Sequence, residues 1–319
     1  MLKIYTYHST IYKYSNNITE STNKIYLYPY NDLKQQVVSQ SIKISGNPNI
    51  YNYLDNYNNR VGFFTLNEPH KKLEIVSETE IISKKGEISK NEMIIPTQWE
   101  YLSDFSKNID ILPFLKTNKF TPNIIKKMFE KKNKSKISPL NLAIEVSDFI
   151  NKNFKYQKGV TNVKTTVEEV WDLKSGVCQD FTNLMIHLCR CLGIPSRYVS
   201  GYILAKGVFR GDGATHAWTE VLVPNIGWVG IDPTNNCVVD SHHIRLAVGG
   251  NYTECTPVKG FYIGDESQKM EIKVIVGTKK IKANQKNFGD NIELKEKIKT
   301  SNDSVNSFRK NLQIIQQQQ

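Results

Sequence analysis

Long apolar runs are absent from this 319-residue sequence, and none approaches the roughly 20 residues that a membrane-spanning helix needs. The first residues, MLKIYTYHST, also lack the apolar segment and small-residue cleavage site of a signal peptide. We therefore expect no membrane partner and a cytoplasmic location. Only five cysteines are present, an odd number, and without a secretory signal they favour reduced thiols over disulfides.

Metal-binding and nucleic-acid-binding motifs are missing as well. No acidic loop of the EF-hand type is present. Cys189 and Cys191 would lie about 200° apart around a helix, and the neighbours His242 and His243 would point to opposite faces of a strand. We expect no metal and no cofactor. The net charge of +11 is spread over many lysines without an RNA- or DNA-binding pattern, so we interpret it as a solvated surface and expect no nucleic-acid partner.

Four regions differ in composition and pattern. Residues 1–95 contain short β-branched and aromatic runs such as KIYLYPY and VGFFTL, separated by turn residues, which predicts a β-rich N-terminal domain. Residues 96–135 form a connecting segment that ends in a charge run. Residues 136–278 form the catalytic core described below. Residues 279–319 are basic, poor in apolar residues and end in QQQQ, so we expect a disordered tail.

The core sequence places its helices before its strands. Residues 140–154 carry apolar side chains at helical spacing, and Thr165 or Thr166 begins a second helix because each has Glu three residues later. A third helix carries Cys178 and ends before Gly193. The later runs SRYVSGYILA, THAWTEVLV, GWVGID, HIRLAVG and MEIKVIVG are typical of strands. This order predicts an α+β fold.

Cys178 is the first candidate for catalysis. It shares a helix face with Phe181 and Met185, so it points inward from the first turn, where the helix dipole favours a thiolate. His187 lies on the opposite face, which we expect to be solvated. A purely structural role remains open, because free cysteines are among the most buried residues.

Two later residues favour a catalytic role. His216 lies on one probable strand and Asp232 ends the next, so they can supply a base and the carboxylate that orients it. Both residues lie on one face only if the hairpin connection is odd in length. The five-residue connection VPNIG pairs Leu222 with Trp228 and meets that condition.

Several segments together resemble one known family. GVCQDFTNLM, LGIPSRYVSGY, HAW, GW and DPTN are similar to the transglutaminase-like superfamily core, and YLYPYND, LDNYNN and EPHKKLEIVS resemble the β-rich N-terminal region of its bacterial-type members. The likeness covers roughly residues 1–277. It implies a papain-like core, in which a helix-borne cysteine packs on an antiparallel sheet, with Cys178 as nucleophile, His216 as base and Asp232 as orienting acid.

The resemblance also implies the chemistry. The expected enzyme forms an acyl-thioester from a glutamine carboxamide or a peptide bond in a protein or peptide, and passes it to a primary amine or to water. Trp218, Tyr202 and Gln179 are the candidate substrate-binding residues, and Trp218 with Tyr198 and Tyr202 could wall an acceptor channel. Hydrolysis alone, a catalytically idle binding scaffold and a basic nucleic-acid binder are the alternatives.

Overall fold

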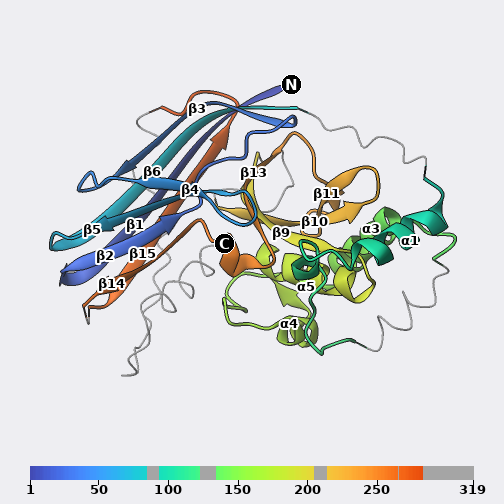
Figure 1. Cartoon of the computed structure of the whole chain (residues 1–319). Coiled ribbons are helices and arrows are strands. Elements are labelled where there is room, and N and C mark those ends of the chain that lie inside the picture. The colour runs from blue at the N-terminus through green and yellow to red at the C-terminus, as the bar shows by residue number, and fades with distance from the viewer. Residues whose placement is uncertain (85–92, 123–133, 205–213, 265, 283–319) are drawn as a thin grey trace.

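The computed structural model describes residues 1–84, 93–122, 134–204, 214–264 and 266–282. The expected tail beyond residue 282 therefore lies outside the described residues. Two four-stranded antiparallel sheets pack around one apolar cluster and form a sandwich beside the helical core (Figure 1). The strands of the sandwich are β1 (Leu2–Ile18), β2 (Glu20–Ile25), β3 (Gln35–Ile44), β4 (Tyr51–Leu54), β5 (Arg60–Leu66), β6 (His70–Ser83), β14 (Val258–Ile263) and β15 (Gln268–Gly277).

The last two strands belong to the sandwich. Its sheets have the orders β15-β1-β6-β3 and β14-β2-β5-β4, so β15 pairs with β1 and β14 pairs with β2. In Figure 1 the orange strands β14 and β15 accordingly lie among the blue ones. The expected core of residues 136–278 includes these two strands, but their pairing places them in the sandwich. Strand pairing over such a separation leaves no local sequence signal.

Alternation of apolar and polar residues explains the sandwich strands. In β6 the side chains from Leu73 to Ser83 alternate between buried and half-buried positions, as expected for a strand with one face on the core. Asn58 has a φ of 60° in the turn between β4 and β5. Asparagine tolerates this left-handed conformation better than most residues, which suits it to the turn.

The core lies between β6 and β14 in the sequence. Its five-stranded antiparallel sheet has the order β12-β11-β10-β9-β13, and α5 packs along β10 with α3 and α4 against it. Its elements are α1 (Ile95–Phe105), η1 (Leu112–Phe114), α3 (Pro139–Asn153), β7 (Lys155–Tyr156), α4 (Val167–Leu173), β8 (Ser175–Gly176), α5 (Cys178–Cys191), β9 (Ser196–Ile203), β10 (His216–Val223), β11 (Gly227–Asp232), β12 (Cys237–Val238), β13 (His243–Gly249) and η3 (Tyr252–Glu254).

Local sequence determines where these helices begin and end. Ser138 caps α3 by accepting the N–H of Asn141. Thr166 and Glu169 form the reciprocal capping box at the start of α4, as predicted. Gly193, with a φ of 81°, follows the end of α5. The α+β fold class expected from the sequence is confirmed.

Two side-chain amides join the sandwich to the core at β13, the outer strand of the core sheet. Gln35 accepts the N–H of Arg245 at 2.8 Å and donates to its carbonyl at 2.9 Å. Asn59 pairs in the same way with the backbone of Val248, at 2.8 and 2.7 Å. Each amide bonds to a backbone N–H and a backbone carbonyl of β13, which are groups that the outer strand of a sheet would otherwise leave unpaired. These bonds fix the position of the sandwich against the core sheet.

Among the described residues, no helix is both long enough and apolar enough to cross a membrane.

Candidate active site

Cys178 is the first residue of α5 and is buried. The carboxylate of Asp180 fixes the turn that precedes it, because its Oδ2 accepts the N–H of Val177 at 2.8 Å and the hydroxyl of Thr161 at 2.6 Å. A Cβ on Gly176 would lie 2.6 Å from the same oxygen. Glycine at this position therefore lets the carboxylate close against the backbone and hold the start of the helix.

The surroundings of Cys178 come from both halves of the chain. Its side chain belongs to the apolar cluster that continues into the sandwich, which also contains Tyr198 of β9, Tyr252 of η3 and Tyr12 of β1. Burial raises the pKa of the Tyr198 hydroxyl well above its usual value, and charge on Cys178 raises it further. Tyr198 and Tyr252, whose pKa values are both raised by burial and by Cys178, are therefore neutral phenols in the surroundings of the thiol.

The β10–β11 hairpin has the register that the sequence predicted. Leu222 pairs with Trp228, and Val223 pairs with Gly227 around a turn in which the N–H of Ile226 bonds to the carbonyl of Val223. Pro224 and Asn225 occupy the centre of this turn, and Asn225 has a φ of 61°, which is typical of a type II turn. With this register, Trp218 lies opposite Asp232, so that Asp232 and His216 share one face as diagonal neighbours.

Asp232 is buried and accepts five hydrogen bonds. Its Oδ1 accepts the backbone N–H groups of Thr234 at 2.9 Å and Asn235 at 3.2 Å. Its Oδ2 accepts from His216 Nε2 at 2.7 Å, Asn235 Nδ2 at 2.8 Å and His243 Nε2 at 3.3 Å. These bonds lower the pKa of Asp232 despite its burial, with the largest favourable contribution from attraction to His216. Asp232 is therefore a carboxylate at neutral pH.

The His216 imidazole bonds to Asp232 and interacts electrostatically with Cys178. Burial alone would lower its pKa, but attraction to Asp232 and their hydrogen bond outweigh burial and raise the pKa to about 10, with a further contribution from interaction with Cys178. Nε2 is engaged by Asp232. Nδ1 is buried, and no nitrogen or oxygen atom of the described residues bonds to it. The arrangement therefore favours an imidazolium whose second nitrogen has no nitrogen or oxygen partner in the part of the chain that the structure describes.

Two further contacts of Asp232 were not predicted. Asn235 follows it by three residues, and the DPTN turn brings the amide back onto the carboxylate; this signal is visible in the sequence. His243 reaches Asp232 from β13 because β13 pairs with β9, which in turn pairs with β10. That arrangement depends on strand order and has no local signal. The sequence analysis considered His243 only as half of a metal pair with His242.

A metal ion fits this cluster poorly, although suitable ligand atoms of His216, Asp232 and His243 lie within 4.8 Å of one another. Both oxygens of Asp232 already accept hydrogen bonds, and the three side chains are buried. A bound ion would have to displace the protons that hold the imidazoles to the carboxylate. The donor set therefore suits a hydrogen-bonded chain better than a metal centre.

Trp218 lies on the same face of the sheet as His216. Its ring centroid is 6.3 Å from that of His216 and 5.3 Å from that of His243. The indole crosses Gly201 of the neighbouring strand, where a Cβ would lie 2.5 Å from the ring. Only glycine leaves room for the indole here, and the ring supports both imidazoles.

The other two candidate substrate-binding residues are elsewhere. Tyr202 is buried on the opposite face of the sheet, and its hydroxyl is 2.8 Å from His8 Nδ1 of β1. Because Val199 pairs with Trp218, strand alternation places Tyr198 and Tyr202 away from Trp218. The aromatic channel that we expected from these three residues is therefore not formed. Gln179 follows Cys178, is buried, and its Oε1 has no hydrogen-bond partner.

The expected solvated face of α5 is covered. His187 is 5% exposed, and its Nε2 bonds to the carbonyl of Phe120 in the connecting segment. Burial lowers the pKa of His187 despite that bond. The interpretation of His187 as a surface residue is therefore wrong, because the connecting segment packs over a helix that is polar on that face.

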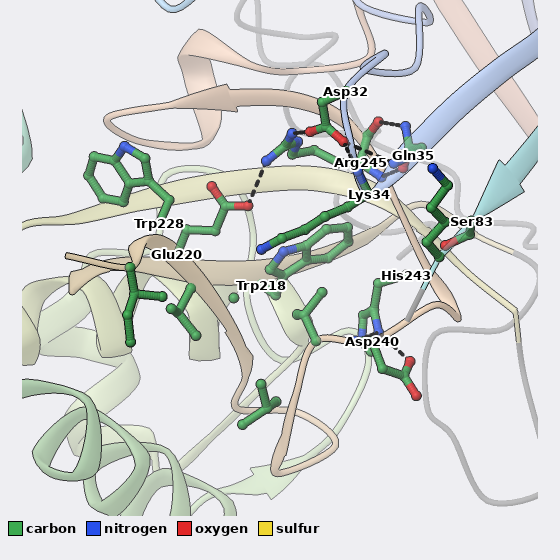
Figure 2. A pocket seen from close by; sticks show the side chains of 16 residues that line it. Asp32, Lys34, Gln35, Ser83, Trp218, Glu220, Trp228, Asp240, His243 and Arg245 are labelled. Atoms are coloured by element: carbon green, nitrogen blue, oxygen red, sulfur yellow. Dashed lines mark hydrogen bonds and ion pairs between the residues drawn. The ribbon is translucent and has the colours of Figure 1, made fainter. Parts of the chain in front are cut away.

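A cavity of about 100 Å³ lies on the Trp218 face, between the sandwich and the core sheet (Figure 2). Trp218, His243 and Asp240 line it from the core, and Lys34 and Lys84 line it from the sandwich. Cys178 is not among the lining residues. The cavity therefore lies behind the His216–Asp232 pair, on the side of His243.

Comparisons with known proteins agree with this architecture. Residues 126–233 match the transglutaminase-like superfamily core, and residues 6–82 match the bacterial transglutaminase-like N-terminal region. An uncharacterized protein of Mycobacterium tuberculosis is 31% identical over 291 residues, which cover 84% of this chain and 90% of the relative. A protein-glutamine gamma-glutamyltransferase of Pseudomonas aeruginosa is 34% identical over 73 residues, which cover 20% of this chain and 11% of that protein.

A solved structure has the same fold over most of the chain. The crystal structure of a candidate cysteine protease from Cytophaga hutchinsonii has a TM-score of 0.66 at 20% identity, and the match covers 88% of this chain and 92% of that one. Both halves of the molecule are thus accounted for by one known architecture. From the family matches and the mycobacterial relative, the chain belongs to the transglutaminase-like superfamily and carries the N-terminal region of its bacterial members.

Proposed function

We propose that this protein is a thiol enzyme that forms an acyl-thioester from a carboxamide or peptide bond. Cys178 is the nucleophile, His216 the proton carrier and Asp232 the residue that orients His216. The thiolate sulfur attacks the carbonyl carbon, and the leaving ammonia or amine takes its proton from the His216 imidazolium. An incoming amine or water then gives a proton to His216 as it attacks the thioester, and the thiolate is released.

The single observation that carries this proposal is the position of His216. Its Nε2 is 2.7 Å from Asp232 Oδ2. Its Nδ1 has no nitrogen or oxygen partner among the described residues, and Cys178 interacts electrostatically with the same ring. A histidine buried only for packing would not need an ionised carboxylate on one nitrogen and a thiol near the other.

The start of α5 supports the same chemistry. The N–H of Val177 is bound by Asp180, whereas the N–H groups of Cys178 and Gln179 belong to the first turn, whose donors have no partner within the helix. These two groups are the candidates for stabilising the oxyanion of the tetrahedral intermediate. Gln179 would thus act through its backbone, while its buried side chain borders the site.

The acceptor decides between transfer and hydrolysis. The similarity to a glutamyltransferase favours an amine acceptor, while the fold of a candidate cysteine protease is compatible with water. We favour transfer from a protein or peptide glutamine to a primary amine. Trp218 remains a candidate for the acceptor side, since it lies beside His216, whereas Tyr202 is held by His8.

The test supplies a glutamine-rich protein and a fluorescent primary amine, with Cys178→Ala as the inactive control. Incorporation that is lost in the variant supports transfer. Release of ammonia or chain cleavage without incorporation, also lost in the variant, supports hydrolysis. Binding of the glutamine-rich protein that is equal in both proteins, with no product from either, would support a binding scaffold and overturn the proposal.

A further inference from the structure

His243 is a buried histidine that the proposed reaction does not use. It begins β13, and its side chain is fully buried. Its Nε2 is 3.3 Å from Asp232 Oδ2. Its Nδ1 is 3.4 Å from Asp240 Oδ1 and also 3.4 Å from the backbone nitrogen of Asp240, whose N–H it can accept when it carries no proton. The contact with Asp240 is drawn in Figure 2 at the edge of the cavity. His243 therefore links the carboxylate beside His216 to a second carboxylate, which is 39% exposed.

We propose that His243 is a positioning residue that shares Asp232 with His216 as a second imidazolium and thereby sets the pH range in which Cys178 is reactive. The inference rests on the proposed function. The inference adds two residues to the proposed catalytic group, His243 and Asp240. The resulting series of side chains runs from Cys178 through His216, Asp232 and His243 to Asp240, and its charges alternate in sign.

Geometry supports a shared carboxylate. The bonds from His216 and His243 end on the same oxygen, Oδ2, while Oδ1 is occupied by two backbone N–H groups. The planes of the two imidazoles are inclined by 42°, with centroids 6.4 Å apart, so both rings can direct Nε2–H at one oxygen. If either bond is removed, the other imidazole shares Oδ2 only with the amide of Asn235.

The titratable groups around His243 favour its charged form. Burial opposes protonation, but hydrogen bonds to Asp232 and Asp240, and interaction with Cys237, raise the pKa of His243 well above its usual value. His242 bonds to the outer side of Asp240 at 2.9 Å. The cations Lys34, Lys84 and Arg245 line the same cavity from the sandwich and from β13, and Glu220 accepts from Arg245. Two carboxylates thus contact His243 directly, whereas these cations only line the cavity.

A positive charge on His243 lowers the affinity of the Cys178 thiolate for a proton, and it also lowers the affinity of the His216 imidazole for a proton. It stabilises the thiolate, and it offsets part of the negative charge through which Asp232 holds a proton on His216. Replacing His243 with glutamine keeps an N–H that can reach Asp232 but removes the charge. The pH at which half of the Cys178 thiol is ionised should then move to higher pH by about half a unit to one unit.

The experiment measures the rate at which iodoacetamide alkylates Cys178 between about pH 5 and about pH 10, which reports the thiolate of the free enzyme. His243→Gln is compared with the wild type and with His70→Gln, which removes a histidine of β6 that bonds to Ser21 and Glu68. We expect His70→Gln to match the wild type. We expect His243→Gln to react about 3- to 10-fold more slowly on the acidic limb, as the shift requires.

The outcomes separate this inference from the proposed function. If wild-type Cys178 has no reactive thiolate at any pH, the proposed function fails. If the wild-type rate rises with pH to a plateau and His243→Gln changes the plateau but not the midpoint of the rise, His243 is only structural and the inference is wrong. Should His243→Gln not fold, ¹⁵N NMR of the wild-type imidazoles decides: two protons on His243 at neutral pH support the inference, and one proton overturns it.

Discussion

The side-chain amide of Gln35 pairs with the backbone of Arg245 as another strand would, donating to its carbonyl and accepting its N–H. Gln35 also donates to the carbonyl of Tyr30 at 2.7 Å. Through these bonds the start of β3 occupies the outer side of β13, two residues from His243. The sandwich therefore contributes to holding the strand on which the second imidazole lies.

Gln35→Ala should destabilise the protein by about 2 kcal/mol, because it leaves the Arg245 N–H buried without a partner. Gln36→Ala is the matched control, since the side chain of Gln36 is exposed and should change stability by less than about 0.5 kcal/mol. Urea unfolding of both variants measures the difference. Equal losses would show that the amide pairing does not stabilise the junction.

Cys178 should be the first of the five thiols to react with iodoacetamide at about pH 6, because it is the one beside His216. Burial raises the pKa of Cys189 to about 12 and that of Cys255 well above its usual value, so both should stay unmodified. Peptide mass spectrometry identifies the labelled residue. Slower labelling in His216→Ala is the control, and prior labelling of Cys191 or Cys237 would contradict the assignment.

Asp232→Asn should lower turnover by about 10³- to 10⁴-fold, because the amide no longer holds the His216 tautomer that serves the thiol. The variant should also lose about 3–5 kcal/mol of stability, since two buried imidazoles lose their shared charge. Steady-state kinetics and denaturant unfolding measure the two effects separately. A variant with near-normal turnover would remove Asp232 from the mechanism.

The free energy of unfolding should depend on pH through the same residues. The pKa of His216 is raised from 6.5 to about 10, so its contribution is complete below 6.5 and is lost as the pH rises towards 10. The pKa of Asp232 is lowered from 3.8, so its contribution is present above 3.8 and is lost in acid. Thermal unfolding should therefore show the highest melting temperature between about pH 3.8 and about pH 6.5, where both contributions are complete. A flat alkaline side would mean that His216 is not charged in the folded protein.

Truncation after Gly277, where β15 ends, should leave the melting temperature and turnover nearly unchanged, because the tail has the composition of a chain that cannot form a core. Truncation after Gly264 should instead prevent folding, since it removes β15 and leaves β1 without one of its two partners. Circular dichroism and calorimetry distinguish the two proteins. A large fall in melting temperature after truncation at Gly277 would show that the tail packs on the core.

Sequence alone predicted the features that local physics determines. The length of the VPNIG connection predicted that His216 and Asp232 share a face, and the Thr166–Glu169 spacing predicted a helix start. The features it missed depend on strand order. The contact of His243 with Asp232, the burial of His187 under the connecting segment, and the separation of Trp218 from Tyr202 all follow from pairings or packing between distant segments.

Pairing between β1 and β15 has a consequence for the order in which the protein is made. β1 is synthesised before the other described elements, yet one of its partners is more than two hundred residues later in the chain. The helix that carries Cys178 and the hairpin that carries His216 and Asp232 are synthesised before β14 and β15 exist. The pairing of β1 with β15 can therefore form only after the core has been synthesised, so a chain interrupted before β14 leaves the sandwich without one strand of each sheet.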